Sequence, residues 1–267
     1  MTSPRTPARN DHSAVTFTPD QLSHDAFLCG RLHLWQPLKG YRAATDPVLL
    51  AAACPAKPGQ TVLDLGCGAG AAALCLGLRV PGLQLYGLEL QEPYATLARR
   101  NATENHLPLH VETGDLTAMP AALKFGFDHV ITNPPYYNSI GSPSPNAARD
   151  TALRAETPIS LWIEAAARRL SPGGWLTLIA GADSLPEILS ALAPRLGSAA
   201  VLPLAPRTGR PALRILLRAR KTGRAAFRLL APFVLHDGPA HDGDRESYTP
   251  KAQAILRELA DLSAEFR

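Results

Sequence analysis

The chain has 267 residues, of which 46% are hydrophobic and 19% charged, so it can bury a globular core and is not globally disordered. No run approaches 18 consecutive apolar residues, which excludes a membrane span. The four cysteines include no CxxC pair, and no paired histidines stand at metal spacing. We therefore expect buried or inert thiols and no metal.

The domain organisation is predicted from composition along the chain. Residues 1–20 mix Pro, Ser, Thr and charge without an apolar stretch of signal-peptide length, which favours a flexible tail on a cytoplasmic protein. Residues 21–58 form an N-terminal extension that ends in a helix opened by Asp46-Pro47. Residues 59–235 form the main domain, and residues 236–267 form a loop and helix packed on it.

Strand-like and helical runs alternate from residue 60 onward. Strands are expected at 61–67, 84–90, 110–115, 127–133, 175–181, 199–205 and 212–220, and the main helices at 71–79, 92–105 and 157–170. A turn at 171–174 separates the last of these helices from the fifth strand. This order predicts an α/β fold with a seven-stranded, mostly parallel, doubly wound sheet. Residues 138–156 lack periodicity and are interpreted as a lid or substrate loop.

Ligands of such a sheet lie at the carboxyl ends of its strands, where three acidic residues follow successive strands. Asp64 precedes a GxGxG turn formed by Gly66, Cys67, Gly68, Ala69 and Gly70. This spacing lacks the third glycine of a dinucleotide fold, so a nucleoside carrying a cationic group is favoured over a pyrophosphate. Glu89 could accept both hydroxyls of a ribose, and Asp115 could accept from an adenine amine.

The most specific motif is Asn133-Pro134-Pro135-Tyr136, at the end of the fourth strand. Two prolines fix the backbone, which leaves the Pro134 carbonyl and the Asn133 side-chain oxygen as two acceptors for the hydrogens of one planar amine. Tyr136 offers a flat face for a base.

Basic residues concentrate between 207 and 228, where no acid occurs. They include Arg218, Arg220, Lys221 and Arg224, and such a stripe suits contact with a polyanion. Because basic and apolar residues alternate there, the solvated face of a strand is the alternative.

The stretches VLDLGCGAG and DHVITNPPYY resemble the class I S-adenosylmethionine-dependent methyltransferases of the NPPY group, which methylate exocyclic base amines or glutamine amides. The resemblance implies a methyltransferase domain over 59–235 that uses S-adenosyl-L-methionine. It also implies that Asn133, Pro134, Pro135 and Tyr136 are catalytic. The cofactor would be bound by Asp64, Gly66, Cys67, Gly68, Gly70, Glu89, Leu90, Asp115, Leu116 and Asn133.

The segment GYRAATDPVLLAA is similar to the lead-in of one subfamily, the bacterial tRNA(Val)-type adenine N6-methyltransferases. That similarity implies that residues 21–58 cover the cofactor through Tyr41, Arg42 and Asp46. RNA, and tRNA in particular, is then the expected partner. Its flipped base would stack on Tyr136 and Tyr137, and its phosphates would meet the basic stripe.

The resulting hypothesis is methyl transfer to the 6-amino group of an adenine in RNA, with a tRNA anticodon loop as the first candidate. Two other acceptors stay open, a glutamine amide in a protein and another base amine in ribosomal RNA. The remaining alternative is an RNA-binding protein without catalysis. The sequence leaves the oligomeric state undetermined.

Overall fold

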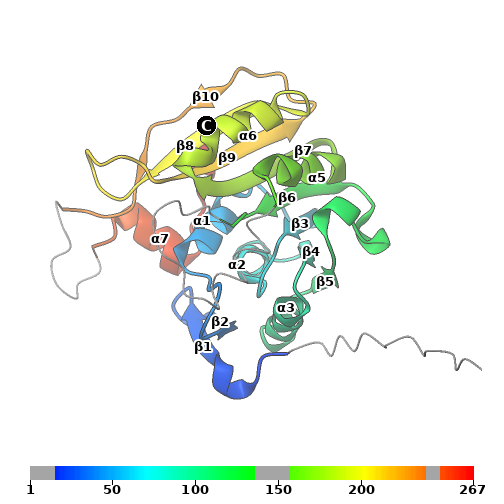
Figure 1. Ribbon diagram of the computed structural model, residues 1–267. Helices are drawn as coiled ribbons and strands as arrows, with labels where there is room; N and C mark the ends of the chain where they lie inside the picture. Colours follow the sequence, from blue (N-terminus) through cyan, green and yellow to red (C-terminus); the bar gives the residue numbers. More distant parts are fainter. Residues whose placement is uncertain (1–15, 136–156, 239–246) are drawn as a thin grey trace, which may run out of the picture.

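The computed structural model describes residues 16–135, 157–238 and 247–267 (Figure 1). Tyr136, Tyr137 and the loop expected at 138–156 lie outside these residues. Of the expected tail, residues 16–20 are described, and the Phe17 ring meets Tyr94 edge-on with 5.4 Å between centroids. In the three described stretches, no helix is long and apolar enough to cross a membrane.

One mixed sheet forms the centre of the molecule, in the order β10-β8-β9-β7-β6-β3-β4-β5. Five parallel strands make up most of it: β3 (Thr61–Leu65), β4 (Gln84–Glu89), β5 (Leu109–Thr113), β6 (Phe127–Thr132) and β7 (Leu170–Gly181). β9 (Arg214–Lys221) runs antiparallel between β7 and β8 (Leu196–Ala205). The predicted α/β fold and its seven strands are confirmed. Two-residue strands β10 (Arg228–Leu229) and β11 (Phe233–Val234) add to the β8 edge.

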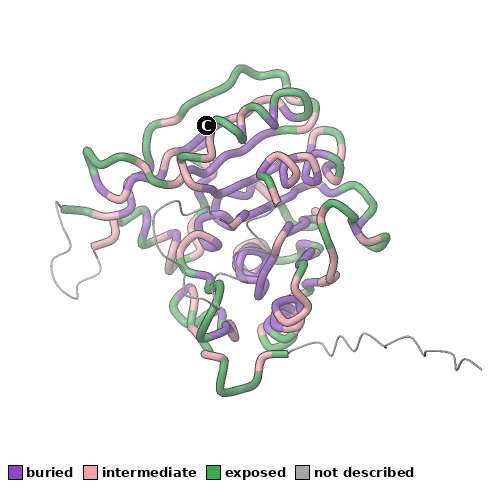
Figure 2. The backbone as a smooth tube through the Cα atoms, in the orientation of Figure 1, coloured by how far each residue is buried: buried purple, intermediate pink, exposed green. Residues whose placement is uncertain are grey.

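Helices cover both faces of the sheet, so its strands are buried in the middle of the molecule (Figure 2). One face packs on α1 (Thr45–Ala53), α2 (Ala71–Arg79), α3 (Glu92–Glu104) and α7 (Pro250–Glu258). The other packs on α5 (Ile159–Arg169) and α6 (Leu185–Leu192). Short 3₁₀ turns complete the described chain: η1 (Pro19–Gln21), η2 (Leu116–Ala118), η3 (Ala121–Leu123), η4 (Ala182–Ser184) and η5 (Ser263–Phe266).

The turn predicted at residues 171–174 is instead part of β7. Leu170 pairs with Phe127 and Trp175 with His129, so residues 171–174 between them bulge out of the ladder. Gly174 makes the bulge possible, because a Cβ there would lie 2.8 Å from the Asp128 carbonyl oxygen.

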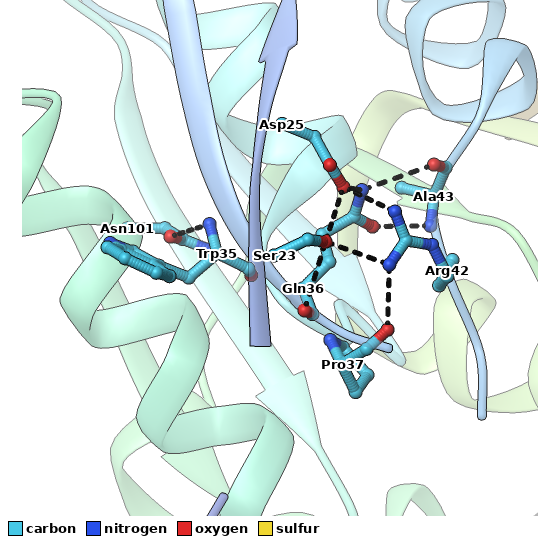
Figure 3. A network of polar contacts seen from close by, with 8 residues as sticks. All are labelled: Ser23, Asp25, Trp35, Gln36, Pro37, Arg42, Ala43 and Asn101. Carbon is cyan, nitrogen blue, oxygen red and sulfur yellow. Dashed lines mark hydrogen bonds and ion pairs between the residues drawn. The ribbon is translucent and has the colours of Figure 1, made fainter. Parts of the chain in front are cut away.

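The N-terminal extension consists of a hairpin of β1 (Leu22–Phe27) and β2 (Leu32–Pro37), followed by α1. Side chains of α3 and of Asn105 just after it bond the hairpin to the main domain, and one of them is a fully buried amide. Asn101 of α3 accepts from the Trp35 backbone N–H at 2.8 Å (Figure 3). It also donates to the Ala69 carbonyl at 2.9 Å. Its side chain is fully buried. Because Ala69 belongs to the glycine turn, the extension lies directly against the carboxyl ends of the strands.

Candidate active site

The glycine turn after β3 adopts a backbone that side chains would prevent. Gly66, Gly68 and Gly70 have φ angles of +70°, +56° and +86°. A Cβ on Gly66 would lie 2.6 Å from the Trp162 ring. The turn is tied to β4 by the N–H groups of Gly66 and Cys67, which donate to the Leu88 carbonyl at 2.8 and 3.0 Å. The turn therefore exposes backbone between two strand ends, where a flat ligand can approach.

Two buried carboxylates flank this turn. Glu89, 2% exposed, accepts from the backbone N–H groups of Gly68 at 2.8 Å and Gln91 at 3.0 Å. Asp64, also 2% exposed, accepts from the Ala73 N–H at 3.2 Å in the first turn of α2. Burial, together with a smaller effect of the neighbouring charge of Glu89, raises the pKa of Asp64 to about 7. A bound cation near Asp64 would favour its ionised form.

Asn133 begins the NPPY motif directly after β6. Its Nδ2 donates to the Tyr41 hydroxyl at 3.1 Å, which fixes the orientation of the amide. Its Oδ1 is buried and has no hydrogen-bond partner among the described residues. Leaving a buried acceptor unsatisfied costs about 1–3 kcal/mol, so this atom is prepared for a donor that arrives with a ligand.

Two adjoining clefts meet at Gly66 and Asn133. The first, about 500 Å³ with its open mouth, is also lined by Glu89, Leu90, Asp115, Leu116, Pro135, Thr157 and Trp162. The second, about 340 Å³, is lined by Gln36, Tyr41, Asp64, Cys67 and the start of α2. A ligand spanning both would place its middle beside the free oxygen of Asn133.

The structure thus brings most of the predicted cofactor residues to one place. Gly68 and Gly70 shape the turn, since a Cβ at Gly70 would lie 3.2 Å from Leu109. Asp115 lines the first cleft, but its Oδ1 already accepts from the Thr117 N–H at 2.7 Å as a cap of η2.

Arg42 and Asp46 differ from their predicted role. The Arg42 guanidinium pairs with Asp25 at 2.7 Å and donates to the Pro37 carbonyl, within the hairpin network of Figure 3. Asp46 forms an ion pair with Arg214 of β9. Neither lines a described cleft, because each charge is neutralised by a neighbouring element. They hold the covering segment in place, and only Tyr41 of the predicted trio lines the site.

The basic stripe also differs from its predicted role. Arg218, 6% exposed, donates to the Ala53 carbonyl at the end of α1 and lies 4.0 Å from the Phe266 ring centroid. Burial lowers its pKa to about 10. Arg220 donates to Gly173 and Lys221 to Leu170, at the end of β7 opposite the clefts. Arg224 is exposed beyond β9 on that same side. The stripe therefore lies away from the NPPY motif. Arg218 is buried in it, whereas Arg220 and Arg224 are exposed, as the solvated-face alternative expects.

Sequence reasoning missed two residues of the site. Gln36, 2% exposed, lines the second cleft and binds the backbone N–H of Ala43 at 2.6 Å, which positions the covering segment (Figure 3). Trp162 of α5 lines the first cleft, and its buried Nε1–H has no partner within the described chain. Trp162 is distant in sequence from the motifs, and only the predicted Thr157-Pro158 helix start hinted that α5 begins at the site. Gln36 lies shortly before the GYRAATDPVLLAA segment but is not part of it.

Among the described residues, no three His, Cys, Asp or Glu side chains form a group that could hold a metal ion. Cys54, Cys67 and Cys75 are buried, whereas Cys29 is exposed. Burial raises the pKa of Cys54 to about 11 and that of Cys75 to about 12, so these thiols stay protonated.

The doubly wound sheet, with its clefts at the carboxyl ends of the strands, matches the fold of the methyltransferases. The methyltransferase small domain model matches residues 44–199, and the chain belongs to this family. It is a class I S-adenosylmethionine-dependent methyltransferase. The site fits this cofactor, because the glycine turn leaves room for it, and the buried carboxylates of Asp64 and Glu89 at neighbouring strand ends can accept from ammonium and hydroxyl groups.

Relatives and a solved structure agree with this family. The chain is 32% identical over 174 residues to a tRNA1(Val) (adenine(37)-N6)-methyltransferase of Porphyromonas gingivalis, covering 61% of this chain and 68% of the relative. A protein of the same name from Dickeya chrysanthemi is 27% identical over 231 residues, covering 82% and 87%. The crystal structure of a predicted O-methyltransferase from Agrobacterium tumefaciens superposes with a TM-score of 0.65 at 27% identity, covering 81% of this chain and 97% of that one.

Proposed function

We propose that the protein transfers the methyl group of S-adenosylmethionine to the exocyclic 6-amino group of an adenine in tRNA. The observation that carries the proposal is the buried, unpartnered Oδ1 of Asn133, held in orientation by Tyr41. The names of the curated relatives support adenine 37, in the anticodon loop, as the target. A tRNA substrate also favours the predicted cytoplasmic location.

The chemistry follows from the poor nucleophilicity of this amine, whose lone pair is delocalised into the ring. Asn133 Oδ1 and the Pro134 carbonyl would each accept one amine hydrogen, which favours a pyramidal nitrogen and stabilises its developing positive charge. S-adenosylmethionine, when bound, would supply the methyl group. The amine nitrogen would accept it in line as the carbon–sulfur bond breaks, and the extra proton would leave to solvent. No strong general base is required.

The residues that line the two clefts indicate which part of the cofactor each cleft would bind. The first cleft would take the adenosyl group, with Glu89 accepting from the ribose hydroxyls and with Leu90 and Leu116 on either side of the base. The second would take the amino acid end, with the ammonium group near Asp64. Their junction at Asn133 then places the methyl group beside the acceptor. Tyr136 and Tyr137 remain predicted stacking residues.

Other acceptors fit the site less well. A hydroxyl oxygen, which the name of the Agrobacterium neighbour implies as the acceptor of that protein, has a single hydrogen and would leave one of the two acceptors unused. A glutamine amide offers the same planar NH₂ group and stays the second candidate. A base amine in ribosomal RNA would also offer two hydrogens to the same two acceptors. A protein that only binds RNA would not need the Asn133 Oδ1 as an acceptor for an amine hydrogen. That role does not explain why this atom has no hydrogen-bond partner among the described residues.

The test is methyl transfer from labelled cofactor to an unmodified tRNA(Val) transcript, with nucleoside mass spectrometry of the product. Asn133→Ala should lower the single-turnover rate by roughly 100-fold, the effect of removing one preorganised polar group. Tyr41→Phe, which only frees the amide to rotate, should cost less, about tenfold. Affinity for S-adenosylhomocysteine should change little in either variant. Near-normal transfer by Asn133→Ala at saturating tRNA would refute the mechanism.

A further inference from the structure

A second groove opens beside the first cleft, between α5 and the connection from β5 to β6. It encloses about 860 Å³ with its open side, and its walls come from η2, from Met119 and Lys124 on either side of η3, and from the outward face of α5. Leu116 lines both the groove and the first cleft, so the two adjoin at this residue. Trp162 faces the cleft, whereas Leu161 and Ala165 of the same helix face the groove.

The charge of this groove is predominantly positive. Lys124, Arg168 and Arg169 line it, and Glu164 is the one acid among the described residues that do. Glu164 lies between two arginines, Arg168 and Arg195, and cannot neutralise both. The Arg168 side chain is 68% exposed, so its guanidinium can exchange an exposed ion pair for a phosphate at little cost.

The position suits the backbone of a strand whose base is in the cleft. Trp162 and Arg168 are six residues apart on one helix, a separation of about 9 Å along its axis. A nucleotide chain leaving the cleft over Leu116 would therefore meet these cations close to the inserted base. Lys124, Arg168 and Arg169 lie on the α5 side of the sheet. In contrast, Arg220 extends from the other face of β9, with its Nε bound to the Gly173 carbonyl.

We propose that this groove, lined by Lys124, Arg168 and Arg169, is the docking surface for the phosphate backbone of the substrate RNA next to the methylated base. The inference rests on the proposed function, because it needs RNA as the substrate. It replaces the basic stripe of β9 as the phosphate contact.

Two matched variants, each losing two positive charges, test the proposal. The groove variant is Lys124→Gln with Arg168→Gln, and the control is Arg220→Gln with Arg224→Gln. Binding of an unmodified tRNA(Val) transcript is measured across a salt series, with S-adenosylhomocysteine affinity as a check on the fold. We expect the groove variant to lose about fivefold or more in RNA affinity and to lower the salt slope by about 1.4 to 1.8. The control should bind like the wild type.

The outcomes separate this inference from the proposed function. A wild-type chain that methylates tRNA while the groove variant keeps its RNA affinity and salt slope would refute the groove alone. Equal losses in both variants would also refute it, because they would indicate diffuse charge attraction. A wild-type chain that neither binds nor methylates RNA, or that methylates a glutamine peptide instead, would refute the proposed function and the groove with it.

Discussion

Replacing Asp64 by Asn should change how the stability of the free protein depends on pH. The carboxyl group of Asp64 is 2% exposed, and burial raises its pKa from the ordinary 3.8 to about 7. The folded chain therefore holds a proton on Asp64 in a pH range where the unfolded chain has lost it. Asn has nearly the same shape and no charge, so it removes this proton and little else.

The magnitude follows from the size of the shift. A carboxyl whose pKa is raised on folding gives its full stabilisation below the unfolded pKa, and that stabilisation falls as the pH rises through the folded pKa. About three pKa units at 1.36 kcal/mol each correspond to roughly 4 kcal/mol, lost between about pH 4 and pH 7. Between pH 5 and pH 7 alone, the free energy of unfolding should fall by roughly 2 kcal/mol relative to Asp64→Asn.

Urea denaturation at half-unit steps from pH 5 to pH 8, without cofactor, measures the difference between wild type and Asp64→Asn. Asp183→Asn, which removes an exposed carboxylate, serves as the matched control. A constant difference over this range would refute the buried, protonated state. In the same range, wild-type affinity for S-adenosylhomocysteine should rise with pH, because its ammonium group pairs with the ionised form. Asp64→Asn should bind more weakly at every pH and lose this dependence.

Three further predictions follow from contacts in and around the site. Gly66→Ala should lower the free energy of unfolding by about 1–3 kcal/mol in urea denaturation and weaken cofactor binding, because its Cβ would meet the Trp162 ring in a backbone suited to glycine. Trp162→Phe should keep stability but lower S-adenosylhomocysteine affinity about two- to tenfold by calorimetry, and unchanged affinity would mean that Nε1–H meets no ligand atom. Arg218→Met should lower the free energy of unfolding by about 1–3 kcal/mol while RNA affinity stays the same, and weaker RNA binding would restore its predicted role.

The sequence alone determined the architecture and the chemical centre of this protein. Alternating apolar strands and helices predict a covered parallel sheet, because strands buried on both faces leave that pattern along the chain. The sequence also predicts that Asp64, Glu89 and Asn133 lie near one another, because the carboxyl ends of parallel strands lie at one edge of the sheet. Local backbone rules were enough to predict these positions. The glycines before a helix allow a tight turn, and the two prolines after a strand fix the backbone.

Only the tertiary structure decided what the charged side chains do. From the sequence, Arg218 and Arg220 were predicted to belong to a stripe that contacts a polyanion. Because β9 runs antiparallel to β7, their end of the strand lies away from the site. Arg218 is also buried against α1. Arg42 forms an ion pair with Asp25 of β1. Trp162 lines the cleft from α5, a helix distant in sequence from the glycine turn. A long charged side chain makes its contacts with whichever element packs nearby. Its role therefore depends on strand direction and helix placement, which no local stretch of sequence specifies.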